Sequence, residues 1–490
     1  MESISRRTFL GSVAASVAFT ANGRLAFSQE VSGAQQMRIR ESLAGHFATD
    51  LPSFDGIFVF DQSVCRAMAT DYGHYVHNMP LGALFPKSVM DVQKAVRYAN
   101  SKHLKLTMRG TGGAAYGQSQ VNAGIVIDSS TLSHIAWVTA DSIDAGPGAL
   151  WKEVAEFTTT RQMTPPVVPD SLYISVGGTL NAGGIGETSY RFGAQVDHVV
   201  ELDVVTGAGD LLTCSLSRHA ELFHMVLAGM GQCGIIVRAR LSLVPAPDQV
   251  VVRRFTYDNM GAWLADLAML ASAEPEGAIA GDLNLQSDGR TWTPVITITS
   301  FRNHPTVWWD RITGKESQPA ITQSFIEYLN RNTEEYLTTL ASGARFHPHV
   351  YMHFFLPAEQ APSMVDYLMN TPGATLGADE IAVFPMINSN FKQTLQRMPA
   401  GSMSYHMRIY RVAAQEGSPD HIQMLGLNQK ECLPRIFAHG GTVYLPFSPL
   451  LDSNQRLRQF GQTAWNRLAA AKAMYDPADV LTPGAGLFQA

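Results

Sequence analysis

The chain has 490 residues, 46% of them hydrophobic, and a formal net charge of −6 at pH 7. A chain of this length buries a large core and is expected to form two structural domains, or one domain split by an insertion. The negative charge and the absence of a long basic run argue against a nucleic-acid partner bound through its phosphates and favour a small-molecule substrate.

The N-terminus has the pattern of an export signal. The segment Ser5-Arg-Arg-Thr-Phe-Leu10 precedes an apolar run over residues 13–20, and Ala26-Phe-Ser28 is a small-x-small cleavage site before Gln29. We expect residues 1–28 to be a twin-arginine signal peptide that exports the folded protein to the periplasm or the medium. The alternative is an ordinary secretory signal with a fortuitous arginine pair. No later segment has the roughly 20 continuous apolar residues that span a bilayer, so no membrane span is expected.

A strand–helix–strand order follows. Ser88 is a plausible N-cap for a helix with apolar residues at helical spacing up to Ala99, and strands are expected at 104–108 and 124–128. The loop between these strands contains Gly110, Gly112 and Gly113. Because glycine lacks a Cβ, the loop can form a concave nest of N–H groups for a phosphate, although such turns are also common as purely structural loops.

The next region contains a second glycine-rich segment. A helix is expected over 150–161, followed by a glycine-rich loop over 170–186 that embeds apolar residues, a pattern that fits a loop wrapped around an apolar ring system. Strands at 199–205 and 211–214 are expected to form a hairpin, and Pro245 and Pro247 indicate a boundary.

Beyond this boundary the chain changes character. Strand patterns at 295–299 and 350–355 alternate with amphipathic helices, which predicts a substrate-binding insertion built on an antiparallel sheet. A single helix is expected over 456–471.

Several stretches agree on one family. They are Asp71-Tyr-Gly73, Ala83-Leu-Phe-Pro-Lys-Ser-Val89, Arg109-Gly-Thr-Gly112 with Gly117-Gln118, Asp170-Ser-Leu-Tyr-Ile-Ser-Val-Gly-Gly-Thr179, Glu201-Leu-Asp-Val-Val-Thr-Gly207, Glu221-Leu-Phe223, Gly231-Gln232, Gly234-Ile-Ile-Val-Arg-Ala-Arg240, Tyr444-Leu-Pro446 and Tyr475-Asp-Pro477. The chain resembles FAD-dependent oxidoreductases with the vanillyl-alcohol-oxidase (PCMH) type of flavin domain, and within them it is most similar to cytokinin dehydrogenases. The substrate region matches less well.

The resemblance implies an α+β fold with a two-subdomain flavin domain split in sequence. The FAD-binding parts would cover residues 50–246 and 448–490, and an α+β substrate domain with an antiparallel sheet would cover 247–447. It also implies which residues hold FAD. Around the pyrophosphate these are Met108, Gly110, Thr111, Gly112, Gly113 and Ala114, and around the rest of the cofactor they are Gln118, Asp170, Ser175, Asn181, Ile185, Ile236 and Tyr444.

One departure from the family concerns the cofactor bond. The family usually joins a histidine covalently to the flavin after the second of these glycines, and this chain has Gly113 there. The second glycine-rich segment contains no cysteine that could serve instead. We therefore expect FAD to be bound non-covalently. Ala485 is a second departure, because the family has glutamine at this position.

The resemblance also assigns two acids to catalysis. Asp170 falls on the family's catalytic aspartate and is our candidate base for the N–H proton, with a turn residue after Pro169 as the alternative. Glu276 resembles a glutamate that assists at the family's entrance, and a solvated loop glutamate is the alternative. Arg408 and Arg411 lie in a segment that lines the family's substrate cavity, where they either bind an anionic substrate or form surface ion pairs.

Neither the histidines nor the cysteines form a metal motif. His347, His349 and His353 lack an accompanying carboxylate pattern, so packed or exposed histidines are expected and no metal. The cysteines, which lack C-x-x-C spacing, predict neither a zinc site nor a disulfide framework and favour small buried apolar residues; they are Cys65, Cys214, Cys233 and Cys432.

Together these features predict an exported FAD enzyme that oxidises a secondary amine. By resemblance the substrate is an N6-isoprenoid adenine, which yields adenine and an aldehyde through an imine, and the electrons pass to a quinone-like acceptor or oxygen. The divergent substrate region leaves open an alcohol, a sugar or a secondary metabolite as substrate. A flavin-free binding protein that has lost catalysis is the third alternative.

Overall fold

The computed structural model describes residues 17–19, 25–27, 50–273, 276–301 and 311–488. Most of the expected signal peptide, including its arginine pair, lies outside the described residues, which there comprise only the antiparallel strands β1 (Val17–Phe19) and β2 (Leu25–Phe27). The described part is α+β, as predicted. None of its helices is long and apolar enough to cross a membrane.

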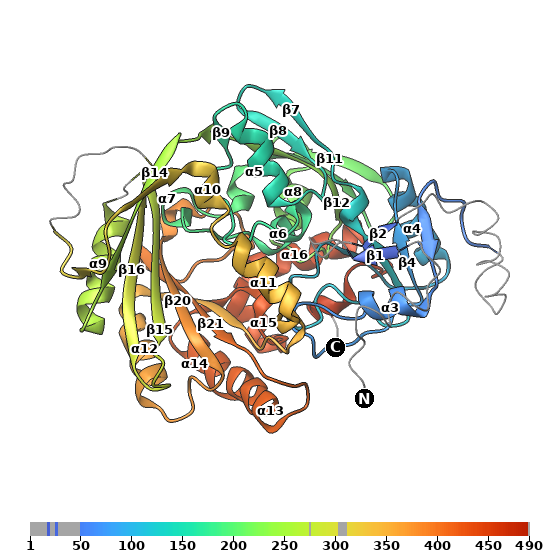
Figure 1. Ribbon diagram of the computed structural model, residues 1–490. Coiled ribbons are helices and arrows are strands. Elements are labelled where there is room, and N and C mark those ends of the chain that lie inside the picture. The colour runs from blue at the N-terminus through green and yellow to red at the C-terminus, as the bar shows by residue number, and fades with distance from the viewer. Residues whose placement is uncertain (1–16, 20–24, 28–49, 274–275, 302–310, 489–490) are drawn as a thin grey trace.

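A four-stranded sheet forms the first part of the flavin-binding region, at one end of the molecule (Figure 1). Its order is β3 (Ile57–Val59), β4 (Gly82–Phe85), β6 (Ile125–Asp128) and β5 (Leu106–Arg109), with β4, β6 and β5 parallel. Helix α3 (Gln62–Met68) follows β3, and α4 (Val89–Ser101) connects β4 to β5. As predicted, Ser88 caps α4: its side chain accepts a hydrogen bond from the Asp91 N–H at 3.4 Å.

A five-stranded antiparallel sheet forms the second part. Its order is β11 (Leu211–Ser215), β10 (Val199–Val205), β12 (Ile235–Ser242), β8 (Ser142–Ala145) and β7 (Ile135–Thr139). The predicted hairpin is confirmed, because β10 and β11 pair directly. The associated elements are α5 (Trp151–Thr159), β9 (Met163–Thr164), α6 (Val176–Ala182), α7 (Ser189–Phe192), α8 (Ala220–Val226) and β13 (Val244–Pro245), which pairs with β9.

The expectation of a loop throughout 170–186 is wrong, because α6 lies within this segment. Ser175 caps α6 and accepts a hydrogen bond from the Gly178 N–H at 3.3 Å, while Val176 and Leu180 are fully buried. Tertiary packing thus overrides the weak helix propensity of a glycine-rich sequence.

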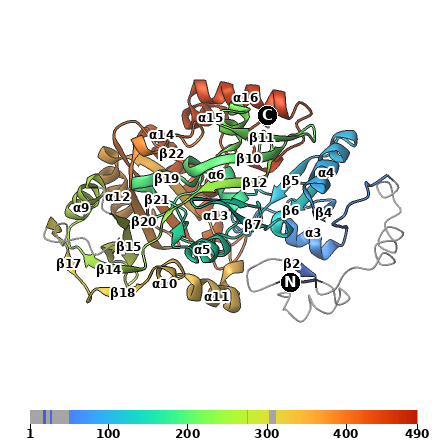
Figure 2. The same ribbon diagram turned by 90° about the horizontal axis from the view of Figure 1, so that it is seen from above.

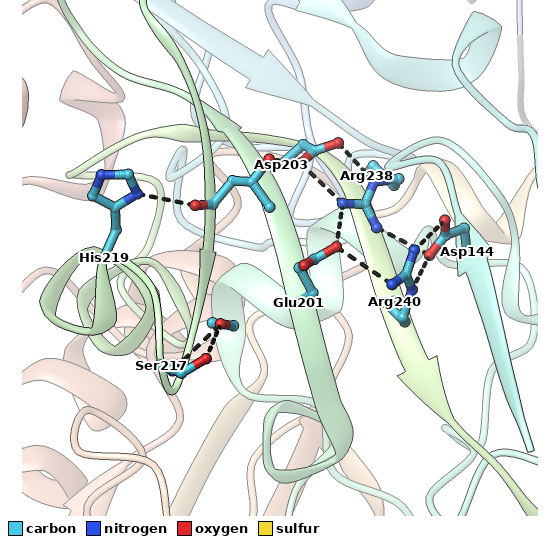
Figure 3. A network of polar contacts seen from close by, with 9 residues as sticks. Asp144, Glu201, Asp203, Ser217, His219, Arg238 and Arg240 are labelled. Carbon is cyan, nitrogen blue, oxygen red and sulfur yellow. Dashed lines mark hydrogen bonds and ion pairs between the residues drawn. The ribbon is translucent and has the colours of Figure 1, made fainter. Parts of the chain in front are cut away.

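Ion pairs cover one face of the five-stranded sheet (Figure 3). Arg238 on β12 pairs with Asp144 at 3.0 Å, Glu201 at 2.7 Å and Asp203 at 2.6 Å, and Arg240 pairs with Asp144 at 2.9 Å. The arginines and acids come from three adjacent strands, so the network ties β8, β10 and β12 together.

The third sheet, of nine strands, is wholly antiparallel and lies at the opposite end of the molecule (Figures 1 and 2). Its order is β17 (Lys315–Glu316), β14 (Gln249–Thr256), β16 (Trp292–Ser300), β15 (Gly277–Leu285), β20 (Ala378–Ile387), β21 (Met403–Arg411), β19 (Met352–Pro357) and β22 (Thr442–Val443), and β18 (Ile321–Ser324) also pairs with β14. The predicted antiparallel sheet is confirmed.

The two faces of this sheet differ in chemistry. One face is apolar and packs against α9 (Met260–Ser272), α12 (Ala361–Asn370) and α14 (Leu433–Ala438). The other face meets the flavin-binding region, with Phe355, Ala382 and Phe384 joining the core of that region. The remaining helices of this half are α10 (Phe325–Leu329), α11 (Thr333–Ser342) and α13 (Pro419–Gly426).

The C-terminal segment returns to the flavin-binding region. The expected single helix over 456–471 is wrong: α15 (Ser453–Phe460) and α16 (Gln462–Tyr475) are separated by Gly461, whose φ of +73° interrupts the helix. After α16, the Leu106 N–H donates to the Val480 carbonyl at 2.8 Å, and the Thr482 N–H donates to the Leu106 carbonyl at 2.8 Å. The C-terminal segment thus packs against β5 of the first sheet, as a split flavin domain requires, while the predicted domain bounds stay predictions.

Candidate active site

A cavity with an empty volume of about 1040 Å³ lies where the glycine-rich segments converge. Loop residues 108–114, helix α6 and the strand β12 with its preceding turn line it, together with the segment 444–447 and Thr482. The predicted cofactor residues that line it are Met108, Gly110, Thr111, Gly112, Gly113, Ala114, Gln118, Ser175, Asn181, Ile236 and Tyr444.

Two predicted cofactor residues do not line this cavity. Ile185 is 6% exposed and belongs to the hydrophobic core, and Asp170 lines a neighbouring cavity. Gln118 reaches the wall but has a structural task as well: its amide donates to the Leu445 carbonyl at 2.8 Å and so anchors the segment 444–447.

The loop glycines allow close approach of the backbone. A Cβ on Gly110 would lie 2.1 Å from Ser175 Oγ, and Gly112 has a φ of +71°. By contrast, a Cβ on Gly113 would meet only Ile174, at 3.6 Å. Gly110 therefore lets the loop pack against the start of α6, whereas Gly113 has open space in front of it.

Asp71 holds the far end of this loop. Its carboxyl accepts hydrogen bonds from the Gly117 N–H at 2.6 Å and the Gly73 N–H at 3.1 Å. Burial raises the pKa of Asp71 to about 6. This gives the Asp71-Tyr-Gly73 motif a physical role that the sequence alone did not reveal.

The residues around the first cavity fit FAD. Glycines expose backbone groups for a pyrophosphate, and Ile174, Ile236 and Phe447 supply apolar surface for a ring system. In addition, Asn181 Oδ1 and Ser119 Oγ are buried and lack a hydrogen-bond partner within the described ranges. Buried polar atoms of this kind indicate that a polar ligand completes the site.

A second cavity, also of about 1040 Å³, lies beside the start of β15 in the nine-stranded sheet, which we call the substrate sheet, and both predicted catalytic acids line it. The segment 164–170 lines this cavity and leads directly into the segment that lines the first. Glu276 pairs with Arg191 at 3.7 Å. Arg331, which follows α10, pairs with Glu187 at 2.7 Å. Both glutamates of the second cavity thus form ion pairs with arginines.

Asp170 pairs with Arg408 of β21. The Arg408 side chain is 9% exposed, so the expectation of a surface ion pair is wrong for this residue. It is wrong for Arg411 too, which is fully buried and donates to Asn428 and to the Ala374 carbonyl. The other carboxyl oxygen of Asp170, Oδ1, is buried and has no hydrogen-bond partner in the described part of the chain.

His353 on β19 and His349, which precedes this strand, belong to an aromatic cluster. His353 is buried 4.4 Å from the Phe447 ring, and burial together with the charge of Arg408 holds its pKa well below the usual value. His349 is buried beside Tyr72, and burial lowers its pKa to about 4. His347 is exposed. Within the described ranges, no group of three or more His, Cys, Asp or Glu side chains is placed to hold a metal ion. The four cysteines are buried and free, as predicted.

Comparison with known proteins identifies the cofactor-binding part. Residues 80–215 match the family model for an FAD-binding domain, and residues 317–488 match the model described as cytokinin dehydrogenase 1, FAD and cytokinin binding. The chain thus contains an FAD-binding domain and is similar to FAD-dependent oxidoreductases. FAD is its cofactor. The first matched region contains the glycine loop and helix α6, and the second contains strands β18 to β22 and the C-terminal segment.

Relatives of this flavoprotein cover most of its length. An uncharacterised oxidoreductase, ORF5 of the fasciation locus of Rhodococcoides fascians, is 28% identical over 88% of this chain and 98% of its own. Cytokinin dehydrogenase 10 of Oryza sativa subsp. japonica is 29% identical over 87% of this chain and 88% of its own. The crystal structure of 6-hydroxy-D-nicotine oxidase from Arthrobacter nicotinovorans has a TM-score of 0.71 at 18% identity, covering 89% of this chain and 98% of that one, and so shares the fold.

Proposed function

We propose that this flavoprotein oxidises a secondary amine, as cytokinin dehydrogenases do, with FAD bound non-covalently. The proposed substrate is an N6-isoprenoid adenine. The observation that carries the proposal is Asp170 Oδ1, a buried carboxyl oxygen without a partner in the described part of the chain, on a residue that lines the cavity next to the cofactor site. A buried acceptor left unpaired is costly, and an N–H group of a substrate satisfies it.

When bound, FAD accepts a hydride from the substrate carbon. Asp170 Oδ1 accepts a hydrogen bond from the substrate N–H and takes its proton once the C=N bond has formed. The substrate thus loses one hydride and one proton, and water cleaves the resulting imine into adenine and an aldehyde. The electrons then pass to a quinone-like acceptor or to oxygen.

Anaerobic mixing with isopentenyladenine tests the substrate. We expect the yellow absorbance of the protein to bleach, and we expect Asp170→Asn to retain the absorbance while bleaching about 100 to 10,000 times more slowly, the range for losing a general base. A panel of alcohols and sugars run beside it identifies the alternative substrates. A flavin that the alcohols bleach and no secondary amine bleaches contradicts the proposal.

Acid precipitation tests the cofactor bond. Because Gly113 has no side chain to react with the flavin, free FAD is expected in the supernatant and a colourless pellet below it. A yellow pellet would instead mean a covalent bond elsewhere in the chain.

A further inference from the structure

Arg408 lies on β21, on the face of the substrate sheet that meets the flavin-binding region. Register places it between Ala382 on β20 and His353 on β19, and Ala382 in turn pairs with Asp282 on β15. Directly paired residues share a face, so this row crosses the wall that faces the flavin-binding region. Met407 and Ile409 flank Arg408 along β21 and lie on the other face of the sheet, where they are fully buried in the apolar core.

Arg408 is held in one orientation. Its guanidinium lies 4.3 Å from the centre of the Phe384 ring, Nε donates to His406 Nδ1 at 3.4 Å, and Nη1 contacts the Tyr410 hydroxyl at 3.5 Å as well as Asp170 Oδ2. Such packing preorganises the ion pair and fixes which oxygen of Asp170 remains available.

Several other ionisable groups surround Asp170. Glu380 of β20, Asp282 of β15, Tyr410 of β21 and Arg331 all lie within electrostatic range of it. Burial raises the pKa of Asp282 to about 8, so this acid is neutral at pH 7, while Arg331 is already paired with Glu187. Arg408 is therefore the cation that directly balances the Asp170 carboxylate.

We propose that Arg408 is a positioning residue that sets the substrate class: by pairing with Asp170 Oδ2, it makes Oδ1 an acceptor for an N–H group, so that the site oxidises amines in preference to alcohols. This inference rests on the proposed function. A carboxylate held in an ion pair still accepts a hydrogen bond but takes up a proton less readily.

The chemistry of the two substrate classes explains the preference. When a neutral amine loses a hydride, the nitrogen lone pair forms the C=N bond, and the N–H proton can leave afterwards. An alcohol that loses a hydride leaves a protonated carbonyl, so its O–H proton must be taken up during the step by a stronger base. An arginine-paired carboxylate is suited to the first reaction and poorly suited to the second.

The first experiment needs no substrate. Thermal midpoints of wild type, Arg408→Met and Arg408→Met/Asp170→Asn are compared at pH 5 and pH 8. In Arg408→Met, the buried Asp170 carboxylate lies near other acids and has lost its cation. The thermal midpoint of this variant is therefore expected to fall further below that of the wild type at pH 8, where an unpaired carboxylate is charged, than at pH 5. The double variant should remove this pH dependence. An equal loss at both pH values overturns the inference.

The second experiment reads specificity from anaerobic flavin bleaching between pH 5 and 9 by isopentenyladenine and by the matching allylic alcohol, 3-methyl-2-buten-1-ol. Arg408→Met should shift the acidic limb for the amine to higher pH, because an adjacent arginine favours the charged carboxylate. Its amine-to-alcohol rate ratio should fall at least about tenfold, because a carboxylate without the arginine takes up the alcohol proton more readily. Arg408→Lys should restore both.

Arg411→Met is the matched control, because it removes another buried guanidinium from the same strand without touching Asp170. One outcome is that isopentenyladenine bleaches the wild-type flavin while Arg408→Met changes neither the acidic limb of the pH profile nor the amine-to-alcohol rate ratio. In that case the inference is wrong and the proposed function stands. If alcohols bleach the wild type and amines do not, both the inference and the proposed function fail.

Discussion

At the scale of single residues, neighbouring glycines of the cofactor loop have different tasks. Gly110 allows the loop to contact Ser175, which caps α6, whereas Gly113 borders the cofactor cavity with only Ile174 within reach of a Cβ. The loop therefore has room for a side chain at Gly113 but not at Gly110, three residues earlier.

Gly110→Ala is expected to lose FAD, because the new methyl group displaces Ser175 Oγ and removes a helix cap worth about 1 kcal/mol. Gly113→Ala, the matched control, should keep the cofactor and gain about 0.4 to 1 kcal/mol of stability through a less flexible unfolded chain. Flavin absorbance after dialysis and the thermal midpoint measure both effects. Equal FAD retention by the two variants would contradict this assignment.

The sequence predicts the residues of the cofactor cavity better than the contacts around Asp170 in the second cavity. The glycines, Asn181 and Tyr444 follow from motifs that the family shares. The Asp170–Arg408 pair joins residues 238 positions apart in different parts of the fold, and no local pattern announces it. The one available signal is the alternation in β21, where His406, Arg408 and Tyr410 form a polar face within a buried strand.

At the scale of elements, the C-terminal segment is anchored by a buried ion pair. Lys472 on α16 is 5% exposed and donates to Asp476 Oδ2 at 2.6 Å. Asp476 is 2% exposed and also accepts hydrogen bonds from the Val480 and Leu481 N–H groups, both at 2.9 Å. These bonds shape the turn that brings residues 480–482 onto β5, and they explain the Tyr475-Asp-Pro477 motif.

Asp476→Ala should destabilise the protein by about 3 kcal/mol, the lower end for breaking a buried ion pair. FAD affinity should fall as well, since Thr482 lines the cofactor cavity. Chemical denaturation with and without added FAD measures both. The double variant Lys472→Met/Asp476→Ala should recover part of the stability because no buried ammonium is left with only the more exposed Asp479 as its ion-pair partner, and no recovery would contradict the ion-pair explanation.

Elements with local signals were predicted correctly. Helix α4 follows from its cap and spacing, and the β10–β11 hairpin follows from two strand patterns around a short turn. Helix α6 and the break at Gly461 were missed for opposite reasons. Packing stabilises a helix in a glycine-rich segment in the first case, and a positive φ interrupts a helical pattern in the second.

At the scale of the whole molecule, ion pairs balance the acidic side chains on the partly exposed face of the five-stranded sheet. On the five-stranded sheet, Arg238 and Arg240 neutralise three half-buried acids (Figure 3). Burial alone raises the pKa of Asp203, but hydrogen bonds from Arg238 and Thr213 outweigh it and hold the pKa below the usual value. Asp144 behaves in the same way through Arg240 and Arg238.

These lowered pKa values predict the pH dependence of stability. An acid whose pKa is lower in the folded state stabilises the protein above its unfolded pKa, here 3.8, and this stability is lost as the pH falls through the folded pKa. Arg238→Leu should therefore cost about 1 kcal/mol at pH 7, a figure kept small by partial exposure, and less at pH 3. Thermal unfolding at both pH values measures it.

Arg97→Leu is the control for this experiment. Its ion pair with Asp210 is 3.7 Å long and more than half exposed, so little change is expected at either pH. A cost for Arg238→Leu that stays the same at pH 3 and pH 7 would assign the effect to packing rather than to charge.

We also propose that the protein is exported in its folded state by the twin-arginine route. The double substitution Arg6→Lys/Arg7→Lys should retain the full-length precursor inside the cell, still carrying FAD, because the paired arginines are the address. Cell fractionation with flavin fluorescence measures the distribution. Undiminished export of this variant would favour an ordinary secretory signal.

The meeting of residues 480–482 with β5 sets the order of events during biosynthesis. Leu106 pairs with Leu481, and Thr482 completes the wall of the cofactor cavity. The ribosome makes this wall only after every strand of the substrate sheet has been translated. The cofactor cavity is therefore complete only once residues 480–482 have been synthesised and have packed against β5, so the glycine loop cannot form the finished site on its own.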